Sequence, residues 1–299
     1  MKPPFPWFGG KSRVAPLVWE RFGVVRNYVE PFFGSGAVMF ARPSEPGIET
    51  VNDLDCMVAN FWRAVKSDPE QVAYFADSPV NEADQHARHL WLVSQQEFRE
   101  AMKTDPDYFD PKIAGWWVWG CCMWIGSGWC SRKRPHLGNA GMGVHRKLPH
   151  LGDAGREFLI SYMQEIADRL RRVRVCCGDW ERVCGPTPTT KQGLTGVFLD
   201  PPYGKNACRT SSLYARDDLK VSDAVRQWAI EHSDDPKLRI ALCGYEGEHK
   251  MPKSWKVVAW KARGGYGSQA QASGRENATR ERIWFSPHCL HPGLNYEHD

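Results

Sequence analysis

Short apolar runs alternate with longer amphipathic segments at both ends of the chain. Each run is only a few residues long and is bounded by Gly, Pro or Asp, which is typical of the buried strands of a parallel sheet. The amphipathic segments repeat apolar residues every three or four positions, which is typical of helices that cover such a sheet. We expect strands near residues 27–30, 50–53, 173–177, 197–199, 238–243, 255–260 and 282–286, and helices near residues 14–22, 37–42, 57–65, 157–172 and 220–232.

The alternation stops in the middle of the chain, between residues 61 and 172. Helical patterns occupy residues 72–75 and 82–102, and a run rich in Trp and Cys follows at 116–130. The sequence Pro-His-Leu-Gly occurs at 135–138 and again at 149–152, which is too short a repeat for a solenoid and predicts two similar turns. We therefore expect a discontinuous α/β domain, residues 1–60 and 173–299, that carries a mainly helical insert, residues 61–172.

Charge changes the interpretation of this insert. The net charge of the 299 residues is only +4, but the span 111–152 contains six basic residues and no acidic one. A concentrated positive patch on a nearly neutral body predicts a polyanionic partner. The alternative is a solvated basic loop that contacts no ligand. The basic side chains are Lys112, Arg132, Lys133, Arg134, Arg146 and Lys147.

The composition argues against a membrane or a metal-binding protein. The first residues lack the apolar core of a signal peptide, and the longest apolar run, 113–126, is uncharged but too short to span a bilayer. We therefore expect a cytoplasmic protein whose ten cysteines are reduced, buried thiols. The cysteines lack the paired spacing of a zinc site, and His136, His145 and His150 are interpreted as phosphate or solvent contacts, so no metal is expected.

The predicted strand 197–199 leads into Asp200, Pro201, Pro202 and Tyr203. Two prolines fix the backbone just past the end of the strand, where open α/β sheets bind ligands. The exocyclic amine of adenine is a poor nucleophile because its lone pair is delocalised into the ring. The Asp200 carboxylate and the Pro201 carbonyl can each accept one of its N–H groups and free that lone pair, while Tyr203 can stack on a base outside the duplex.

Three further segments predict a nucleotide-like ligand at the same edge. Lys11 precedes the first predicted helix, where an anion is favoured. Gly34 and Gly36 follow the strand 27–30 and allow close approach of the backbone to a ligand, although a tight turn alone explains them as well. Asp53 stands where an acid that accepts a ribose hydroxyl is expected, but Asp53 or Asp55 can equally cap the following helix. Asp179, after the predicted strand 173–177, is explained by the sequence alone as a helix cap.

The order of these motifs resembles the Dam-like family of DNA N6-adenine methyltransferases, which use S-adenosylmethionine. The resemblance rests on Trp-x-Gly-Gly-Lys at 7–11, Glu-Pro-Phe-x-Gly-x-Gly at 30–36 and Asp-Pro-Pro-Tyr at 200–203. It implies a Rossmann-like seven-strand mixed sheet with an inserted, mainly helical target-recognition domain. It also implies a monomeric enzyme that acts on double-stranded DNA in a bacterial or phage-infected cell, without an obligate protein partner. The cofactor residues that it implies are Trp7, Lys11, Pro31, Gly34, Gly36, Asp53, Asp179 and Asp200.

By the same resemblance, the insert contacts DNA phosphates first and reads bases elsewhere. The phosphate contacts are expected from Arg132, Lys133, Arg134, Arg146 and Lys147.

Two alternatives remain at this point. A methyltransferase that acts on RNA or on a protein amide can use a similar turn, although Asn in place of Asp200 is what an amide substrate favours. A DNA-binding protein that has lost catalysis can keep the same fold as a scaffold. The intact Asp200, Tyr203 and Gly36 argue against that second alternative.

Overall fold

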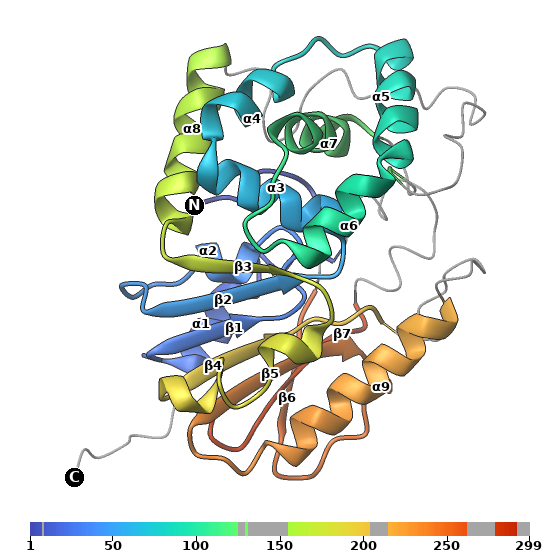
Figure 1. Cartoon of the computed structure of the whole chain (residues 1–299). Coiled ribbons are helices and arrows are strands. Elements are labelled where there is room, and N and C mark those ends of the chain that lie inside the picture. The colour runs from blue at the N-terminus through green and yellow to red at the C-terminus, as the bar shows by residue number, and fades with distance from the viewer. Residues whose placement is uncertain (8, 125–128, 131–154, 204–214, 262–278, 292–299) are drawn as a thin grey trace.

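The computed structural model describes residues 1–7, 9–124, 129–130, 155–203, 215–261 and 279–291 (Figure 1). Its centre is a seven-stranded sheet in the order β3-β2-β1-β4-β5-β7-β6. Neighbouring strands from β3 to β5 are parallel, whereas β7 is antiparallel to both β5 and β6. The expected seven-stranded mixed sheet is thereby confirmed. The strands are β1 (Asn27–Glu30), β2 (Ile48–Asp53), β3 (Val173–Cys177), β4 (Thr195–Leu199), β5 (Leu238–Tyr245), β6 (Lys256–Ala259) and β7 (Glu281–Phe285).

The apolar residues of the central strand β4 face two separate cores. Phe198 belongs to the larger core, whereas Val197 and Leu199 belong to the smaller one, as the alternation of side chains along a strand requires. Helices α1 (Ala15–Phe22), α2 (Ala37–Phe40) and α3 (Cys56–Ser67) contribute to the larger core, and α9 (Ala215–Glu231) contributes to the smaller one. Both faces of β4 are therefore covered, which explains why it reads as a continuous apolar run.

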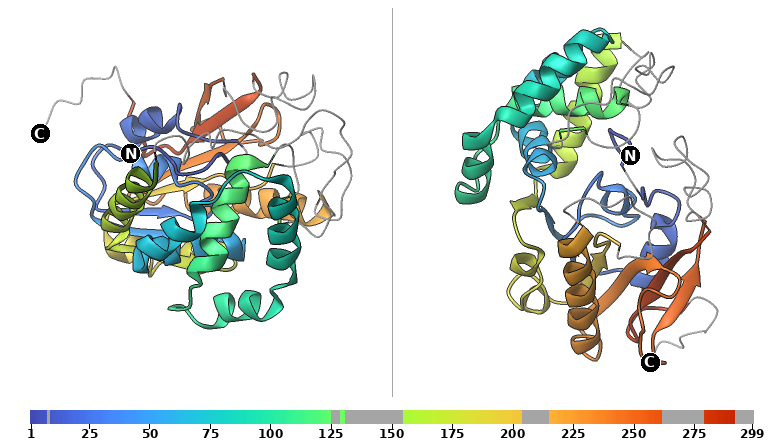
Figure 2. Two further views of the ribbon diagram at one scale, coloured as in Figure 1. Left: turned by 90° about the horizontal axis from the view of Figure 1, so that it is seen from above. Right: turned by 90° about the vertical axis from the view of Figure 1, so that its right-hand side faces the viewer.

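Beyond the β3 edge of the sheet, a group of helices forms an upper layer (Figures 1 and 2). Its members are α3, α4 (Pro69–Ala76), α5 (Glu82–Ser94), α6 (Gln96–Thr104), α7 (Pro111–Met123) and α8 (Gly155–Leu170).

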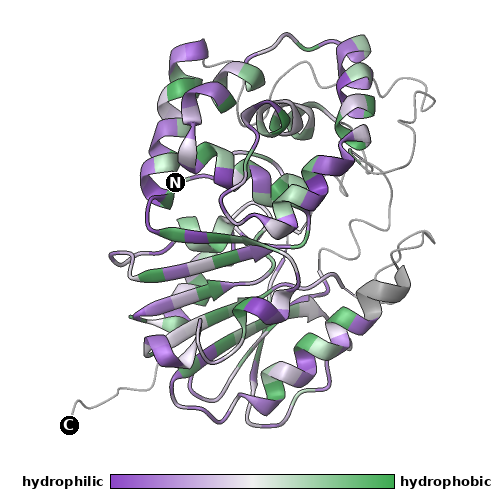
Figure 3. Ribbon diagram, viewed as in Figure 1, coloured by the Kyte–Doolittle hydropathy of each residue, from purple (hydrophilic) through white to green (hydrophobic). Residues whose placement is uncertain are grey.

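Helix α7 is the core of this layer. Its N-cap is Asp110, whose side chain accepts a hydrogen bond from the Ile113 N–H, and Trp117 and Trp119 within the helix are buried. Figure 3 shows hydrophobic residues in α7 and alternating character on α8, in agreement with the burial of one face of α8. The run rich in Trp and Cys thus serves largely as packing.

One expected helix is divided in the structure. The apolar repeat predicts one continuous helix over residues 82–102, but α5 and α6 are separated at Gln95, whose φ and ψ are −76° and 82°. The Ser94 hydroxyl and the Gln95 amide both donate to the Trp91 carbonyl. These side-chain bonds compete with the continuation of the helix, which an apolar repeat does not register.

None of the helices in the described ranges has the length and apolar character that crossing a bilayer requires. The cysteines within those ranges have free thiols. The division into residues 1–60 and 173–299 on one side and 61–172 on the other stays a prediction.

Candidate active site

A cavity of about 270 Å³ opens at the carboxyl ends of β1, β2 and β4. This is the edge of a parallel sheet at which ligands bind in open α/β folds, because the strand order reverses there between β1 and β4. Its lining residues are Trp7, Gly9, Gly10, Lys11, Glu30, Phe32, Phe33, Gly34, Ser35, Ala37, Asp53, Phe198, Asp200, Pro201, Pro202 and Tyr203.

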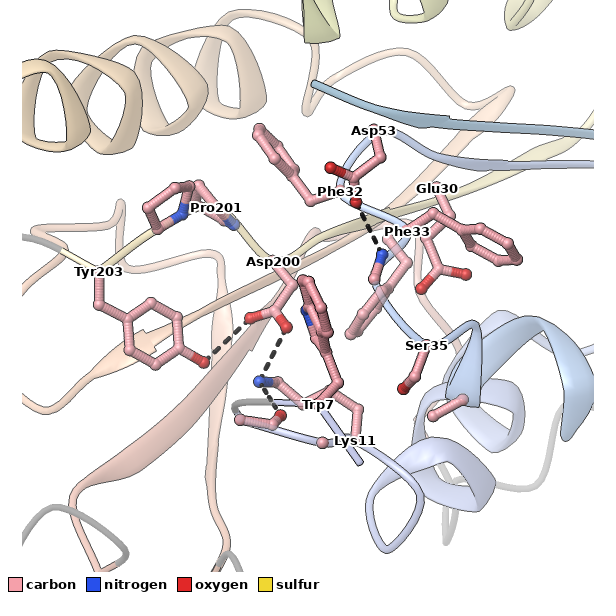
Figure 4. A pocket seen from close by; sticks show the side chains of 16 residues that line it. Trp7, Lys11, Glu30, Phe32, Phe33, Ser35, Asp53, Asp200, Pro201 and Tyr203 are labelled. Carbon is pink, nitrogen blue, oxygen red and sulfur yellow. Dashed lines mark hydrogen bonds and ion pairs between the residues drawn. The ribbon is translucent and has the colours of Figure 1, made fainter. Parts of the chain in front are cut away.

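The Asp200 carboxylate is held by two partners (Figure 4). The Lys11 ammonium lies 2.9 Å from Oδ2, and the Tyr203 hydroxyl lies 3.0 Å from Oδ1. The two prolines turn the chain directly after β4, so the carboxylate and the tyrosine face one another across a single turn. The Tyr203 ring packs edge-to-face against Tyr245, with ring centroids 4.6 Å apart.

Lys11 is buried with only 4% of its surface exposed. Its ammonium also donates to the Gly9 carbonyl at 2.7 Å. Burial disfavours the charged ammonium, but the negative charge of Asp200, with Glu281 adding to it, outweighs burial and raises the pKa of Lys11 above its usual range. The anion expected near Lys11 is thus, in this structure, the side chain of Asp200.

The glycine turn after β1 brings its backbone against aromatic side chains. Gly34 has φ of +47°, and the Trp7 indole occupies the space that a Cβ there would need. The Gly34 carbonyl accepts a hydrogen bond from Trp62 Nε1 at 2.9 Å. Gly36, at φ of +70°, begins α2 and is not among the lining residues. Pro31 also lies outside that lining, and its carbonyl accepts a hydrogen bond from the Asn52 amide at 3.0 Å.

Asp53 and Asp55 were both candidates for two roles, a ligand contact and the cap of the following helix, and the structure assigns one position to each. Asp55 is the N-cap of α3 and accepts the Met57 N–H at 2.8 Å, whereas Asp53 lines the cavity. Asp53 accepts the N–H groups of Gly34 and Asp55, each at 2.9 Å. Burial, followed by the neighbouring Asp55 carboxylate, raises the pKa of Asp53 to about 7.

Asp179 occupies a different position. It is exposed, accepts the Glu181 N–H at 2.9 Å and caps the short 3-10 helix η1 (Trp180–Val183). It is not among the lining residues. The geometry therefore gives it a capping role, and its contact with a cofactor stays a prediction.

Two carboxylates at the site were not expected from the sequence. Glu30, 3% exposed, ends β1, lines the cavity and accepts the Tyr28 hydroxyl at 2.8 Å. Burial raises the pKa of Glu30 well above its usual range. Glu281, also 3% exposed, begins β7 and lies 2.9 Å from the Tyr203 hydroxyl. Glu30 could have been found from its place beside the glycine motif, whereas Glu281 is 78 positions from Tyr203 and has no local signal.

Five predicted DNA contacts and the histidine candidates lie outside the described residues. They are Arg132, Lys133, Arg134, Arg146, Lys147, His136, His145 and His150.

Comparisons with known proteins agree with this geometry. Residues 7–114 match the model of the D12 class N6 adenine-specific DNA methyltransferases. The chain is 23% identical over 240 residues to the type II methyltransferase M.MjaIII of Methanocaldococcus jannaschii, covering 76% of this chain and 78% of that protein. It is 30% identical over 76 residues to the type II methyltransferase M1.LlaDCHI of Lactococcus lactis subsp. cremoris, covering 24% of this chain and 25% of that protein.

The family match ends before Asp200, so the Asp-Pro-Pro-Tyr turn supports the same family independently. Lys11, the glycine turn and Asp53 lie inside the matched segment and line the cavity that Asp200 completes. By its matched segment, its seven-stranded sheet and its relatives, this chain is similar to the D12 class N6 adenine-specific DNA methyltransferases.

Proposed function

We propose that the chain transfers a methyl group from S-adenosylmethionine to N6 of an adenine turned out of double-stranded DNA, at a specific sequence. One observation carries the assignment of roles. The Asp200 carboxylate, at the end of β4, shares a single cavity with Glu30 and Asp53, at the ends of β1 and β2. A methyl donor and an acceptor amine can therefore meet at Asp200.

The chemistry of the cavity fits the proposed cofactor. S-adenosylmethionine carries a sulfonium, an ammonium, a ribose diol and an adenine ring. The cavity offers the Asp53 carboxyl group for the ribose diol, the carboxyl groups of Glu30 and Asp200 for the sulfonium and the ammonium, and aromatic rings for the adenine. When bound, the cofactor supplies a methyl group that is already activated toward a nucleophile. The aromatic side chains are Trp7, Phe32 and Phe33.

The residues around Asp200 would prepare the amine. Asp200 and the Pro201 carbonyl accept its two N–H groups, which frees the lone pair for attack. Lys11 would orient the carboxylate, since its ammonium lies 2.9 Å from Oδ2. The Tyr203 ring lines the same cavity and would border the base.

The upper helical layer would recognise the target. Residues 61–172 contribute most of that layer, and the basic segment 132–147 belongs to the same stretch of chain. We propose that this segment contacts phosphates and that the enzyme acts as a monomer. The cofactor would bind to the sheet, formed by residues before 61 and after 172.

Replacement of Asp200 tests the proposed reaction. Asp200→Ala should lower methyl transfer to DNA on the order of 100- to 10,000-fold, because the amine loses its principal acceptor. Transfer is measured with labelled S-adenosylmethionine on DNA that lacks adenine methylation, with RNA and protein as parallel substrates. Asp168→Asn, an exposed position on α8, is the control. Turnover of Asp200→Ala close to that of the wild type would contradict the mechanism, and labelling of RNA or protein instead of DNA would contradict the substrate.

A further inference from the structure

The Tyr203 hydroxyl lies between two carboxyl groups. Its oxygen is 3.0 Å from Asp200 Oδ1 and 2.9 Å from Glu281 Oε2. Tyr203 is 7% exposed and Glu281 is 3% exposed. A hydroxyl has one proton to donate, so it cannot donate to both carboxylates at once. One of these two short contacts therefore needs a second proton.

The second proton belongs on Glu281. Burial raises the pKa of Glu281 to about 7, Lys11 lowers it and Asp200 raises it further. Burial, with the negative charge of Asp200, also raises the pKa of Tyr203 well above its usual range, so the phenol keeps its own proton. A neutral Glu281 can donate to the Tyr203 oxygen, and Tyr203 can then donate to Asp200. The titratable groups that face Glu281 are Lys11, Asp200, Tyr203, Cys243 in β5 and Glu248 after β5.

Among the described residues, Glu281 is connected by a hydrogen bond to the lining of the cavity through Tyr203. It is not among the described residues that line the cavity, whereas Tyr203 and Asp200 are. It is fixed by the sheet, since β7 pairs with β5 so that Glu281 stands opposite Tyr245. The backbone of Glu281 is thus held in place by strand pairing and not by the turn that carries Asp200 and Tyr203.

We propose that Glu281 is a positioning residue for methyl transfer, which donates a hydrogen bond to the Tyr203 hydroxyl and thereby keeps that hydroxyl donating to Asp200 Oδ1. This inference rests on the proposed function, in which Asp200 accepts the adenine amine. Lys11 holds Oδ2 of the same carboxylate. Both oxygens are then fixed, and the carboxylate keeps one orientation in the cavity. When Glu281 is ionised, it competes with Asp200 for the single proton of the Tyr203 hydroxyl. One of the two carboxylates then loses its hydrogen bond to Tyr203.

Substitutions at Glu281 and Tyr203 test this chain of hydrogen bonds. Glu281→Leu should lower kcat about 5- to 10-fold, the worth of one hydrogen bond, while KM for DNA and the Kd for S-adenosylmethionine stay nearly unchanged. Glu281→Gln should recover most of that loss, because its amide can still donate to the Tyr203 oxygen. In a Tyr203→Phe background, Glu281→Leu should have no further effect on kcat.

The pH dependence separates positioning from a purely structural role. The wild-type kcat should fall as pH rises through about 7, where Glu281 ionises, and this fall should be absent in Glu281→Gln. Glu246→Gln removes an exposed carboxylate that pairs with Arg282 beside the same strand, and it should leave kcat and the pH profile unchanged.

A second measurement needs no activity. The melting temperature of the wild type relative to Glu281→Gln should fall as pH rises from about 4.5 through about 7, since a raised carboxyl pKa stabilises the fold only while the group is protonated. A difference that does not change with pH, additive losses in the double variant, or the same pH profile in Glu281→Gln would each overturn the positioning role alone. Failure of the wild type to methylate DNA would overturn the proposed function as well.

Discussion

At the scale of single residues, the site is governed by buried charges that need partners. Lys11 and Asp200 lie 2.9 Å apart, with 5% and 20% of their side chains exposed. A pair of this kind contributes little net stability, but the loss of one partner leaves the other charge uncompensated in a poorly solvated place. The catalytic carboxylate and its lysine are therefore expected to depend on one another for stability as well as for chemistry.

Lys11→Met should destabilise the protein by about 3 kcal/mol, because Asp200 then keeps a partly buried charge without its cation. Asp200→Asn alone should destabilise it for the converse reason. The double variant should recover part of both losses, since no unpaired charge remains. Urea denaturation of the three variants measures the coupling. If the losses in the double variant simply add, the contact does not contribute to stability, and Lys11 has to be assigned to ligand binding alone.

Asp53 connects cofactor binding to pH. Its pKa of about 7 exceeds the ordinary value of 3.8, so the contribution of its proton to stability is complete below about pH 4 and is lost as pH rises through about 7. An ionised carboxylate is the stronger acceptor for a ribose hydroxyl. Affinity for S-adenosylmethionine should consequently increase as pH rises through about 7 in the wild type.

The comparison variant is Asp53→Asn, which should bind S-adenosylmethionine more weakly at pH 8 by about 1–2 kcal/mol and show no such rise with pH. Its melting temperature relative to the wild type should increase between about pH 4 and pH 8. Calorimetric titrations at several pH values measure the affinity. Equal affinity of both proteins at every pH would remove Asp53 from the cofactor site.

At the scale of helices and strands, the sequence pattern predicts the structure correctly where the residues of one segment determine its secondary structure. The run Asn27–Glu30 forms β1 as expected, because Tyr28 and Val29 favour a strand and a proline follows it. The break at Gln95 was missed because side-chain hydrogen bonds to the Trp91 carbonyl end α5, and hydrophobic periodicity does not report these bonds. Glu281 was missed because its partner Tyr203 is brought to it only by the pairing of β5 with β4 and β7.

The contact between α4 and α7 offers a test of packing in the upper helical layer. A Cβ on Gly115 would collide with Phe75 and lie 2.8 Å from the Val72 carbonyl oxygen of α4. Gly115→Ala should therefore destabilise the protein by about 1–3 kcal/mol. Gly185→Ala is the matched control, since no atom lies within 4 Å of a Cβ placed there. Thermal unfolding compares the two variants. Equal melting temperatures would mean that α4 and α7 can move apart to make room for the added methyl group without a loss of stability.

At the scale of the whole molecule, the order of motifs carried more information than any one of them. The glycine turn at Gly34, the acid Asp53 at the end of β2 and the turn that begins at Asp200 are separated by up to 166 positions in the sequence, yet they line one cavity. Parallel strands bring their carboxyl ends to one edge, so motifs that each follow a strand are expected to meet there. The same reasoning gives no information on the insert, where helix packing rather than strand order decides which side chains face a ligand.

The basic segment 132–147 of that insert is proposed to contact DNA phosphates. If Arg132, Lys133 and Arg134 meet phosphates, replacing all three with Ala should weaken binding to every DNA sequence to a similar extent. It should also reduce the slope of log affinity against log salt by about one unit per lost contact. If one arginine instead contacts a guanine edge, its loss should cost about 1–3 kcal/mol at the recognised site only.

Titrations of cognate and random duplexes at several salt concentrations distinguish these cases. The control variant is Lys66→Ala, which removes a lysine whose ammonium donates a hydrogen bond to the Val173 carbonyl, between α3 and β3. Because the control also removes one positive charge, any general effect of net charge on DNA affinity appears in it too. An identical affinity and an identical salt slope in the triple variant and the wild type would mean that the segment contacts no DNA, and that the positive charge of residues 111–152 serves another purpose.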